Sequence, residues 1–386
     1  MQQKLLYPIG FEFLLIGILI GEPFINFVNG LLKVQLPIPL DSKSLFQLRP
    51  IIAAILGAIG FYVGLQFRIK EILNYSIEHF KLAINDIVFT IILMSGFSFL
   101  LILNFYNENL SLENIIANSL MIGISALTFS PKALELIQNR FEVSGNNFDT
   151  IHKISKVNNF SALTFLGLLF AIFQQGKTNG IQITPVEWFL INIAFGLLIG
   201  FLLFIFLERE ENEAKLLIGL LGIIIFSSGA AYIVNFSPLF LNMFVGFVTG
   251  NILKSKETLV SIFKKLEHPF YVIILIYAGV NIRVDNLWVF VAGVLLYVIL
   301  RLFVKYFNGW LSYHFSINKN KFSSRIGLGL NTQGIIAITT MVSFQQVFNN
   351  QLFNSLFAIV VVAVIVNEII SIKLTKDLLI DLSEIK

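Results

Sequence analysis

Long apolar segments recur along nearly the whole of this 386-residue chain, and short polar stretches separate them. A helix needs about 20 apolar residues to cross about 30 Å of hydrocarbon at 1.5 Å per residue. Twelve segments predict such spans: 8–28, 50–67, 84–105, 114–138, 156–174, 186–207, 215–233, 237–253, 269–282, 287–310, 326–347 and 354–374. The ninth is short, so we expect an oblique or interrupted helix there. The fold class predicted is an all-α polytopic membrane protein.

Composition agrees with a helical bundle in lipid. The chain is 56% hydrophobic and 13% charged, whereas soluble domains are about 45–50% apolar and about 25% charged. Its 26 glycines allow close helix approach. Basic cytoplasmic loops account for a net charge of +4, so no nucleic-acid partner is expected.

Several kinds of chemistry are not expected. The chain contains no Cys, which excludes disulfides, thiolate metal sites and Cys nucleophiles. Its four His have no spacing typical of a zinc site, and no GxxxxGK[ST] phosphate loop occurs. We therefore expect no cofactor and no enzyme activity, and transport that is passive or driven by a gradient. The N-terminus lacks a small-residue cleavage site and is interpreted as a span.

Charge placement predicts the topology. With both termini inside, 20 of the 27 Lys and Arg fall on the cytoplasmic side, and two lie within a span. The other five are Lys33, Lys43, Arg49, Lys177 and Arg283. This bias predicts a multi-pass protein of the cell membrane with both termini cytoplasmic.

Ionisable groups inside spans are the first candidates for function, because each is costly without a partner. Arg301 and Lys305 are four residues apart and share one helix face. They are expected to face an anion, helix-end carbonyls or water; the alternative is snorkelling toward the cytoplasmic interface. The acids Glu12, Glu22, Asp86, Glu135 and Glu368 lie near span ends and are expected at the interface, with Glu135 the most interesting.

Polar interruptions mark the fourth and eleventh spans. Thr128, Ser130 and Pro131 interrupt the fourth span, and residues 331–334 (NTQG) interrupt the eleventh. A pair of broken helices is the best sequence indication of a transporter site, although a proline kink and a polar packing patch would also explain them. Asn158 and Asn159 in the fifth span are either oxygen ligands or interhelical hydrogen-bond donors.

Taken in order, six motifs resemble those of the monovalent cation:proton antiporter superfamily, which includes sodium/hydrogen exchangers and potassium-efflux antiporters. They are residues 15–21 (LIGILIG), 60–70 (GFYVGLQFRIK), 237–246 (SPLFLNMFVG), 269–282 (PFYVIILIYAGVNI), the pair Arg301 and Lys305, and 327–334 (GLGLNTQG). The resemblance implies inverted repeats with two broken crossing helices. It implies core helices at about 84–174 and 287–374, scaffold helices at about 8–67 and 215–282, and a homodimer.

One departure from the family concerns the ion site. Family members usually carry an Asp where this chain has Asn159. An amide can ligate a cation through its oxygen but cannot carry a negative charge. Its loss would leave Lys305 or Arg301 without a counter-charge, although a buried lysine could itself carry the proton. The family's Pro in the eleventh span is also absent, so that crossing is expected to be altered.

The leading hypothesis is a secondary transporter that exchanges Na+ or K+ for H+ by alternating access. Its ion-binding and transport residues would be Asn158, Asn159, Thr128, Ser130, Lys305, Arg301 and Gln333. The alternative is a non-exchanging relative, either a passive uniporter or a regulatory membrane subunit, because the Asp is absent. A bile-acid-like sodium symporter and a membrane-embedded enzyme fit less well.

Overall fold

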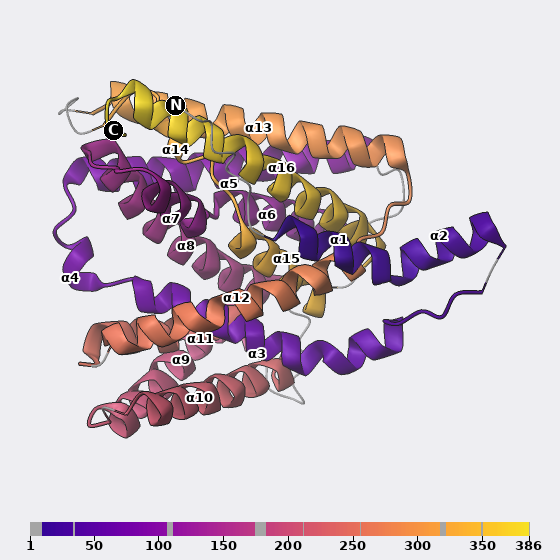
Figure 1. Cartoon of the computed structure of the whole chain (residues 1–386), viewed down its shortest axis with the longest axis horizontal. Helices are drawn as coiled ribbons and strands as arrows, with labels where there is room; N and C mark the ends of the chain where they lie inside the picture. Colours follow the sequence, from indigo (N-terminus) through magenta and orange to yellow (C-terminus); the bar gives the residue numbers. More distant parts are fainter. Residues whose placement is uncertain are drawn as a thin grey trace.

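The computed structural model describes residues 10–33, 35–105, 111–173, 183–210, 212–254, 256–316, 322–348 and 350–385. These residues form helices that mostly run side by side along the molecule's long axis (Figure 1). The only bridges among them are two isolated pairs, so the described chain holds no sheet. The fold is all-α, as the apolar segments predict.

The helices are α1 Phe11–Ile20, α2 Glu22–Leu32, α3 Ser42–Gln66, α4 Ile69–Ile72, α5 Ile77–Phe105, α6 Leu112–Leu127, α7 Pro131–Arg140, α8 Asn146–Phe173, α9 Pro185–Leu207, α10 Glu213–Ile233, α11 Pro238–Ile252, α12 Lys256–Val280, α13 Leu287–His314, α14 Ile326–Gly329, α15 Ile335–Val347 and α16 Gln351–Asp381. Eight helical segments in the described residues are long and apolar enough to cross a membrane, and α1, α11 and α15 are shorter apolar helices. The chain is a multi-pass membrane protein.

Local sequence signals set many helix ends. Thr184 and Glu187 form a capping box at the start of α9, with Pro185 in its first turn. Ser237 caps α11 and Pro238 follows it, after a turn in which Asn235 has a positive φ of 58°. These signals separate α10 from α11, the two spans divided only by a short turn.

Two expected spans differ in the structure. The ninth span was expected to be short and either oblique or interrupted; it is neither short nor interrupted, because α12 is continuous over 25 residues with Pro269 inside it. Its first half carries charged residues that pair with neighbours, so a count of apolar residues underestimates its length. The first span divides at Gly21, whose extended backbone separates α1 from α2. Residues 8–9 of that span lie outside the described residues.

Glycines bring α3 and α11 into backbone contact. A Cβ at Gly64 would lie 1.9 Å from the carbonyl oxygen of Met243, and one at Gly246 would lie 2.0 Å from that of Phe61. No side chain fits at such distances, so these positions require glycine. Close approach of this kind supplies the van der Waals contact that holds helices together in lipid.

The remaining architecture contains the same three-part unit twice. Long α5, broken α6 and α7, and long α8 form the first unit; long α13, broken α14 and α15, and long α16 form the second. The two breaks meet, since a Cβ at Gly334 would lie 2.5 Å from Ser130 Oγ. The crossing is therefore present even though Asn331 and Thr332 replace the family's Pro. It forms the framework of the candidate site.

Candidate functional site: a buried ion pair beside two broken helices

Arg301 on α13 binds the carbonyl ends of both broken helices. Its Nε donates to Ala126 O at 2.9 Å, and its Nη2 donates to Thr128 O at 3.1 Å. Its Nη1 donates to the backbone and side-chain oxygens of Asn331. The guanidinium thus satisfies carbonyls that α6 and α14 leave unpaired and offsets their negative ends. Arg301 is fully buried, which contradicts the snorkelling alternative.

Lys305, one turn further along α13, pairs with Asp86 on α5. Its Nζ lies 2.7 Å from Asp86 Oδ2, and the two side chains are 1% and 0% exposed. Asp86 was expected at the membrane interface, and that expectation is wrong. It supplies the counter-charge that Lys305 was expected to lack.

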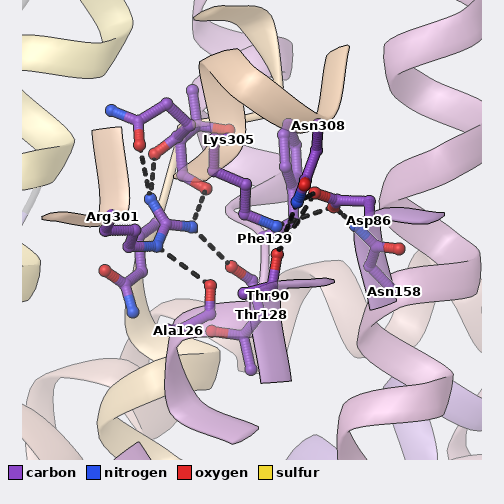
Figure 2. Close-up of polar contacts among 12 residues, drawn as sticks. Asp86, Thr90, Ala126, Thr128, Phe129, Asn158, Arg301, Lys305 and Asn308 are labelled. Carbon is purple, nitrogen blue, oxygen red and sulfur yellow. Dashed lines mark hydrogen bonds and ion pairs between the residues drawn. The ribbon is translucent and has the colours of Figure 1, made fainter. Parts of the chain in front are cut away.

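Three further groups donate to the Asp86 carboxylate. Asn158 Nδ2 donates to Oδ2 at 2.7 Å, and Asn308 Nδ2 and Thr90 Oγ1 donate to Oδ1 at 3.2 Å each (Figure 2). Among the described residues, the Oδ1 atoms of Asn158 and Asn308 are buried without a hydrogen-bond partner. One carboxylate and two unused amide oxygens therefore lie together, and such oxygens are what hard cations require.

Asn159 lies beside this site but bonds elsewhere. Its Oδ1 accepts a hydrogen bond of 2.7 Å from the Phe129 backbone N–H, inside the first break. Thr128 Oγ1 donates to Ser125 O of the preceding turn at 2.7 Å. Both side chains thus satisfy the backbone where the fourth span is interrupted, rather than sharing one point with Asn158.

Gln333 and Ser130 bond on other sides of the crossing. Gln333 Nε2 donates to Ser125 O and to the Tyr297 hydroxyl at 2.9 Å each, and Asn367 donates to its Oε1 at 3.2 Å. Ser130 Oγ donates to Glu368 Oε1 on α16 at 3.0 Å. The seven predicted residues therefore surround one crossing but divide into separate groups.

Asp86 and Asn308 are the site residues that sequence reasoning missed. A carboxylate ten residues into α5, in an apolar run with Thr90 one turn later, was the signal for Asp86. Glu135, expected to be the most interesting acid, is 42% exposed and pairs with Lys264. Asp86 and Glu135 both lie near predicted span ends, and that criterion ranked Asp86 too low and Glu135 too high as site residues.

Two units of the same three-part plan, a pair of crossing broken helices and a buried ion pair between the units define a class of polytopic membrane transport protein. A sequence model of the family described as sodium/hydrogen exchanger, transmembrane, matches residues 3–374. The chain belongs to this family of transporters and is not an enzyme.

Solved structures agree with the fold. The sodium proton antiporter MjNhaP1 from Methanocaldococcus jannaschii at pH 8 is 16% identical, with a TM-score of 0.67 over 96% of this chain and 91% of that one. An electron-microscopy structure of the same antiporter gives 16% identity and a TM-score of 0.64 over 96% and 90% of the two chains. A search of curated proteins found no match.

Proposed function

We propose that this protein exchanges a monovalent cation, Na+ or K+, for H+ by alternating access, and that Asp86 provides the negative charge of the ion site. The observation that carries the proposal is the buried Asp86–Lys305 pair beside two broken helices. Membership of the sodium/hydrogen exchanger family supports the class of reaction. The structurally similar protein MjNhaP1 is a sodium proton antiporter.

The groups around Asp86 suit a partly dehydrated cation. The carboxylate would bind it directly, and the Asn158 and Asn308 amides would turn their free oxygens toward it. Amide groups serve this purpose because each carries both a donor and an acceptor. The same amides therefore stabilise the carboxylate before the cation arrives and the cation afterwards.

Exchange follows from competition at one carboxylate. When the cation binds Asp86, it displaces the Lys305 ammonium, and two positive charges in a dry site repel. The Lys305 ammonium then gives one proton to water and becomes a neutral amine, so an N–H bond of Lys305 is the only covalent bond of the protein that breaks. Rebinding of the proton reverses the step and releases the cation. The family's usual carboxylate corresponds to Asn159 on α8, whereas the carboxylate proposed for this chain is Asp86 on α5.

The charge bias of the loops supports a position in the cell membrane with both termini cytoplasmic. We assign α5–α8 and α13–α16 to a moving core, and α1–α3 and α10–α12 to a scaffold. The family resemblance supports a homodimer formed through the scaffold. Arg301 and Gln333 act by holding the broken helices rather than by touching the cation.

A flux experiment tests the proposal. Purified protein in liposomes with an imposed pH gradient is given Na+, K+ or Li+, and a pH-sensitive dye reports the gradient. We expect cation-dependent collapse with wild type, absent from empty liposomes, and at least a tenfold loss in Asp86→Asn. No response to any cation from folded protein would contradict exchange and favour the passive or regulatory alternative.

Two variants test which residue supplies the negative charge of the ion site. Asp86 and Asn158 are in hydrogen-bond contact, so the double variant Asp86→Asn/Asn158→Asp returns a carboxylate to nearly the same place. We expect it to recover exchange that Asp86→Asn loses. Asn159→Asp tests the family position, and unchanged flux with an unchanged pH profile would remove residue 159 from the mechanism. Failure of the double variant to recover would argue against Asp86 as the exchanging carboxylate.

A further inference from the structure

Glu368 places a second carboxylate at the crossing, on the side opposite the carbonyl ends that Arg301 binds. It accepts a hydrogen bond from Ser130, the residue that precedes α7, and a Cβ at Gly334 would lie 3.1 Å from its Oε1. Gly334 is the N-cap of α15. The carboxylate therefore lies against the N-terminal ends of both half-helices, where backbone N–H groups favour negative charge.

No Lys or Arg in the described part of the chain lies within ion-pair distance of Glu368. Lys132 is the candidate for an ion-pair partner because it lines the same cavities as Glu368, but its ammonium contacts α12 instead. Its Nζ lies 3.8 Å from Glu267 and 4.1 Å from the Tyr271 ring centroid. The direct partners of the Glu368 carboxylate are thus a hydroxyl and helix ends, and Lys132 acts on its charge only from beyond ion-pair distance.

Two cavities border this carboxylate. One, of about 30 Å3, lies between Glu368 and Ser130 on one side and Tyr271 and Leu275 of α12 on the other. The second, of about 120 Å3, lies between α7 and α16 and reaches Asn139, which is exposed. Since about 10–15 Å3 already holds one water, both cavities have room for water and the larger has room for several molecules.

Short contacts connect Glu368 with the Asp86 site. Glu368 binds Ser130, whose neighbour Phe129 donates to Asn159, and Asn158 donates to Asp86. The third helix of each unit thus contributes a polar pair beside a break, Asn158–Asn159 on α8 and Asn367–Glu368 on α16. Only the second of these pairs carries a carboxylate.

We propose that Glu368 and the Ser130 hydroxyl form a second site for the transported monovalent cation, with H+ as the competing ligand. This inference rests on the proposed exchange function. The ionised carboxylate accepts the cation from the larger cavity, and the neutral acid holds one proton in its place. On the topology above the site faces the cytoplasm, and Asp86 is the drier site beyond it.

The charged and titratable neighbours that line its cavities or pair with residues that line them come from three helices. They are Glu12 on α1, Lys132 and Glu135 on α7, and Lys264, Glu267 and Tyr271 on α12. The ion pairs Lys132–Glu267 and Glu135–Lys264 balance four of these charges, and Glu12 accepts a hydrogen bond from the Gly10 backbone N–H. Among the described residues, Glu368 is the carboxylate that lines both cavities and has no ion-pair partner, so its charge is the one that a cation or proton would balance there.

Proton release measures the second site directly. NaCl, KCl or choline chloride is added to detergent-solubilised protein in weakly buffered solution, and a pH dye counts the protons released. We expect Glu368→Gln to release about half as many protons as wild type, and Asp86→Asn to retain a cation-dependent release. The double variant should release none. Glu257→Gln, an exposed acid paired with Arg68, is the matched control and should match wild type.

The outcomes separate this site from the proposed function. Wild-type flux in liposomes decides exchange, whereas the release from Glu368→Gln decides the second site. Folded Glu368→Gln with wild-type release and wild-type apparent cation affinity would overturn the inference. If that variant does not fold, Asp86→Asn decides the question: complete loss of release there would mean that Asp86 is the sole site. Glu368→Asp keeps the charge and should retain release at a weakened apparent affinity, by several-fold.

Discussion

Arg301 and Lys305 are one helical turn apart on α13, yet they bind different kinds of partner. Arg301 donates to backbone carbonyls at two helix ends, and Lys305 pairs with one carboxylate. The planar guanidinium suits several acceptors at once, whereas the ammonium is a compact charge that a cation can replace. Their chemistry therefore separates a positioning role for Arg301 from an exchanging role for Lys305.

Removal of Lys305 should destabilise the protein strongly, because Asp86 would remain buried without its ion partner. Breaking a buried pair from one side costs about 3–5 kcal/mol. The control is Lys264→Ala, whose side chain is 55% exposed and pairs at the surface with Glu135, where such pairs contribute about 1 kcal/mol or less. Thermal unfolding in detergent measures both. A similar decrease in melting temperature for Lys305→Ala and Lys264→Ala would contradict the buried pair.

Among single residues, the sequence predicted the buried cations Arg301 and Lys305 better than Asp86, the carboxylate that pairs with Lys305. The four-residue spacing of Arg301 and Lys305 within an apolar span indicated buried cations that need acceptors. Asp86 could not be assigned in the same way, since its contact with Lys305 joins residues 219 positions apart. The polar residues Asn85 and Thr90 near Asp86 gave some signal, but only packing of α5 on α13 determines which cation it meets.

The helices match the spans predicted from the sequence where the apolar runs are uninterrupted. The breaks between α6 and α7 and between α14 and α15 fall where polar residues and Pro131 predicted them. The prediction failed for α12, because Lys264, Lys265 and Glu267 belong to a continuous helix. Hydropathy measures contact with lipid, whereas the first half of α12 faces water and charged neighbours. Helix length there depends on tertiary ion pairs that a local window does not contain.

The contact between α3 and α11 should depend on glycine at a few positions. Gly64→Ala would place a Cβ 1.9 Å from the Met243 carbonyl oxygen, which forces the helices apart. We expect a loss of at least about 2 kcal/mol, comparable to overpacking of a core. The control is Gly222→Ala on α10, where a Cβ meets nothing within 4 Å and alanine favours the helix. Thermal unfolding should separate the two variants, and equal melting temperatures would contradict backbone contact at Gly64.

For the whole molecule, pattern alone predicted a multi-pass bundle, and the arrangement into two crossing units followed from family resemblance. Nothing in the composition determines that α5 pairs with α13 or that α7 meets α12. Those contacts join the first unit to the second and the first unit to the proposed scaffold. The contact between α7 and α12 is the one at which the two parts would have to slide if the proposed core moves.

Two ion pairs join α7 of the proposed core to α12 of the proposed scaffold, Lys132–Glu267 at 3.8 Å and Glu135–Lys264 at 3.6 Å. Partly exposed pairs of this kind contribute little stability, so they can separate and re-form during a transport cycle. Alternating access requires this, because one side of the molecule must open as the other closes. The structure would then represent one member of a cycle in which these pairs break.

A reversible cross-link tests whether they must separate. The chain has no native Cys, so Glu135→Cys/Lys264→Cys can be joined with a cleavable reagent that reacts with both thiols. We expect cross-linking to reduce cation-dependent flux at least tenfold, and cleavage to restore it. The matched control is Arg325→Cys/Asp381→Cys, which replaces an ion pair of 3.1 Å between the start of α14 and the end of α16, within the proposed core. That cross-link should leave flux unchanged, since its two ends move together. Full flux through the cross-linked α7–α12 pair would rule out movement between these two helices as the transport step.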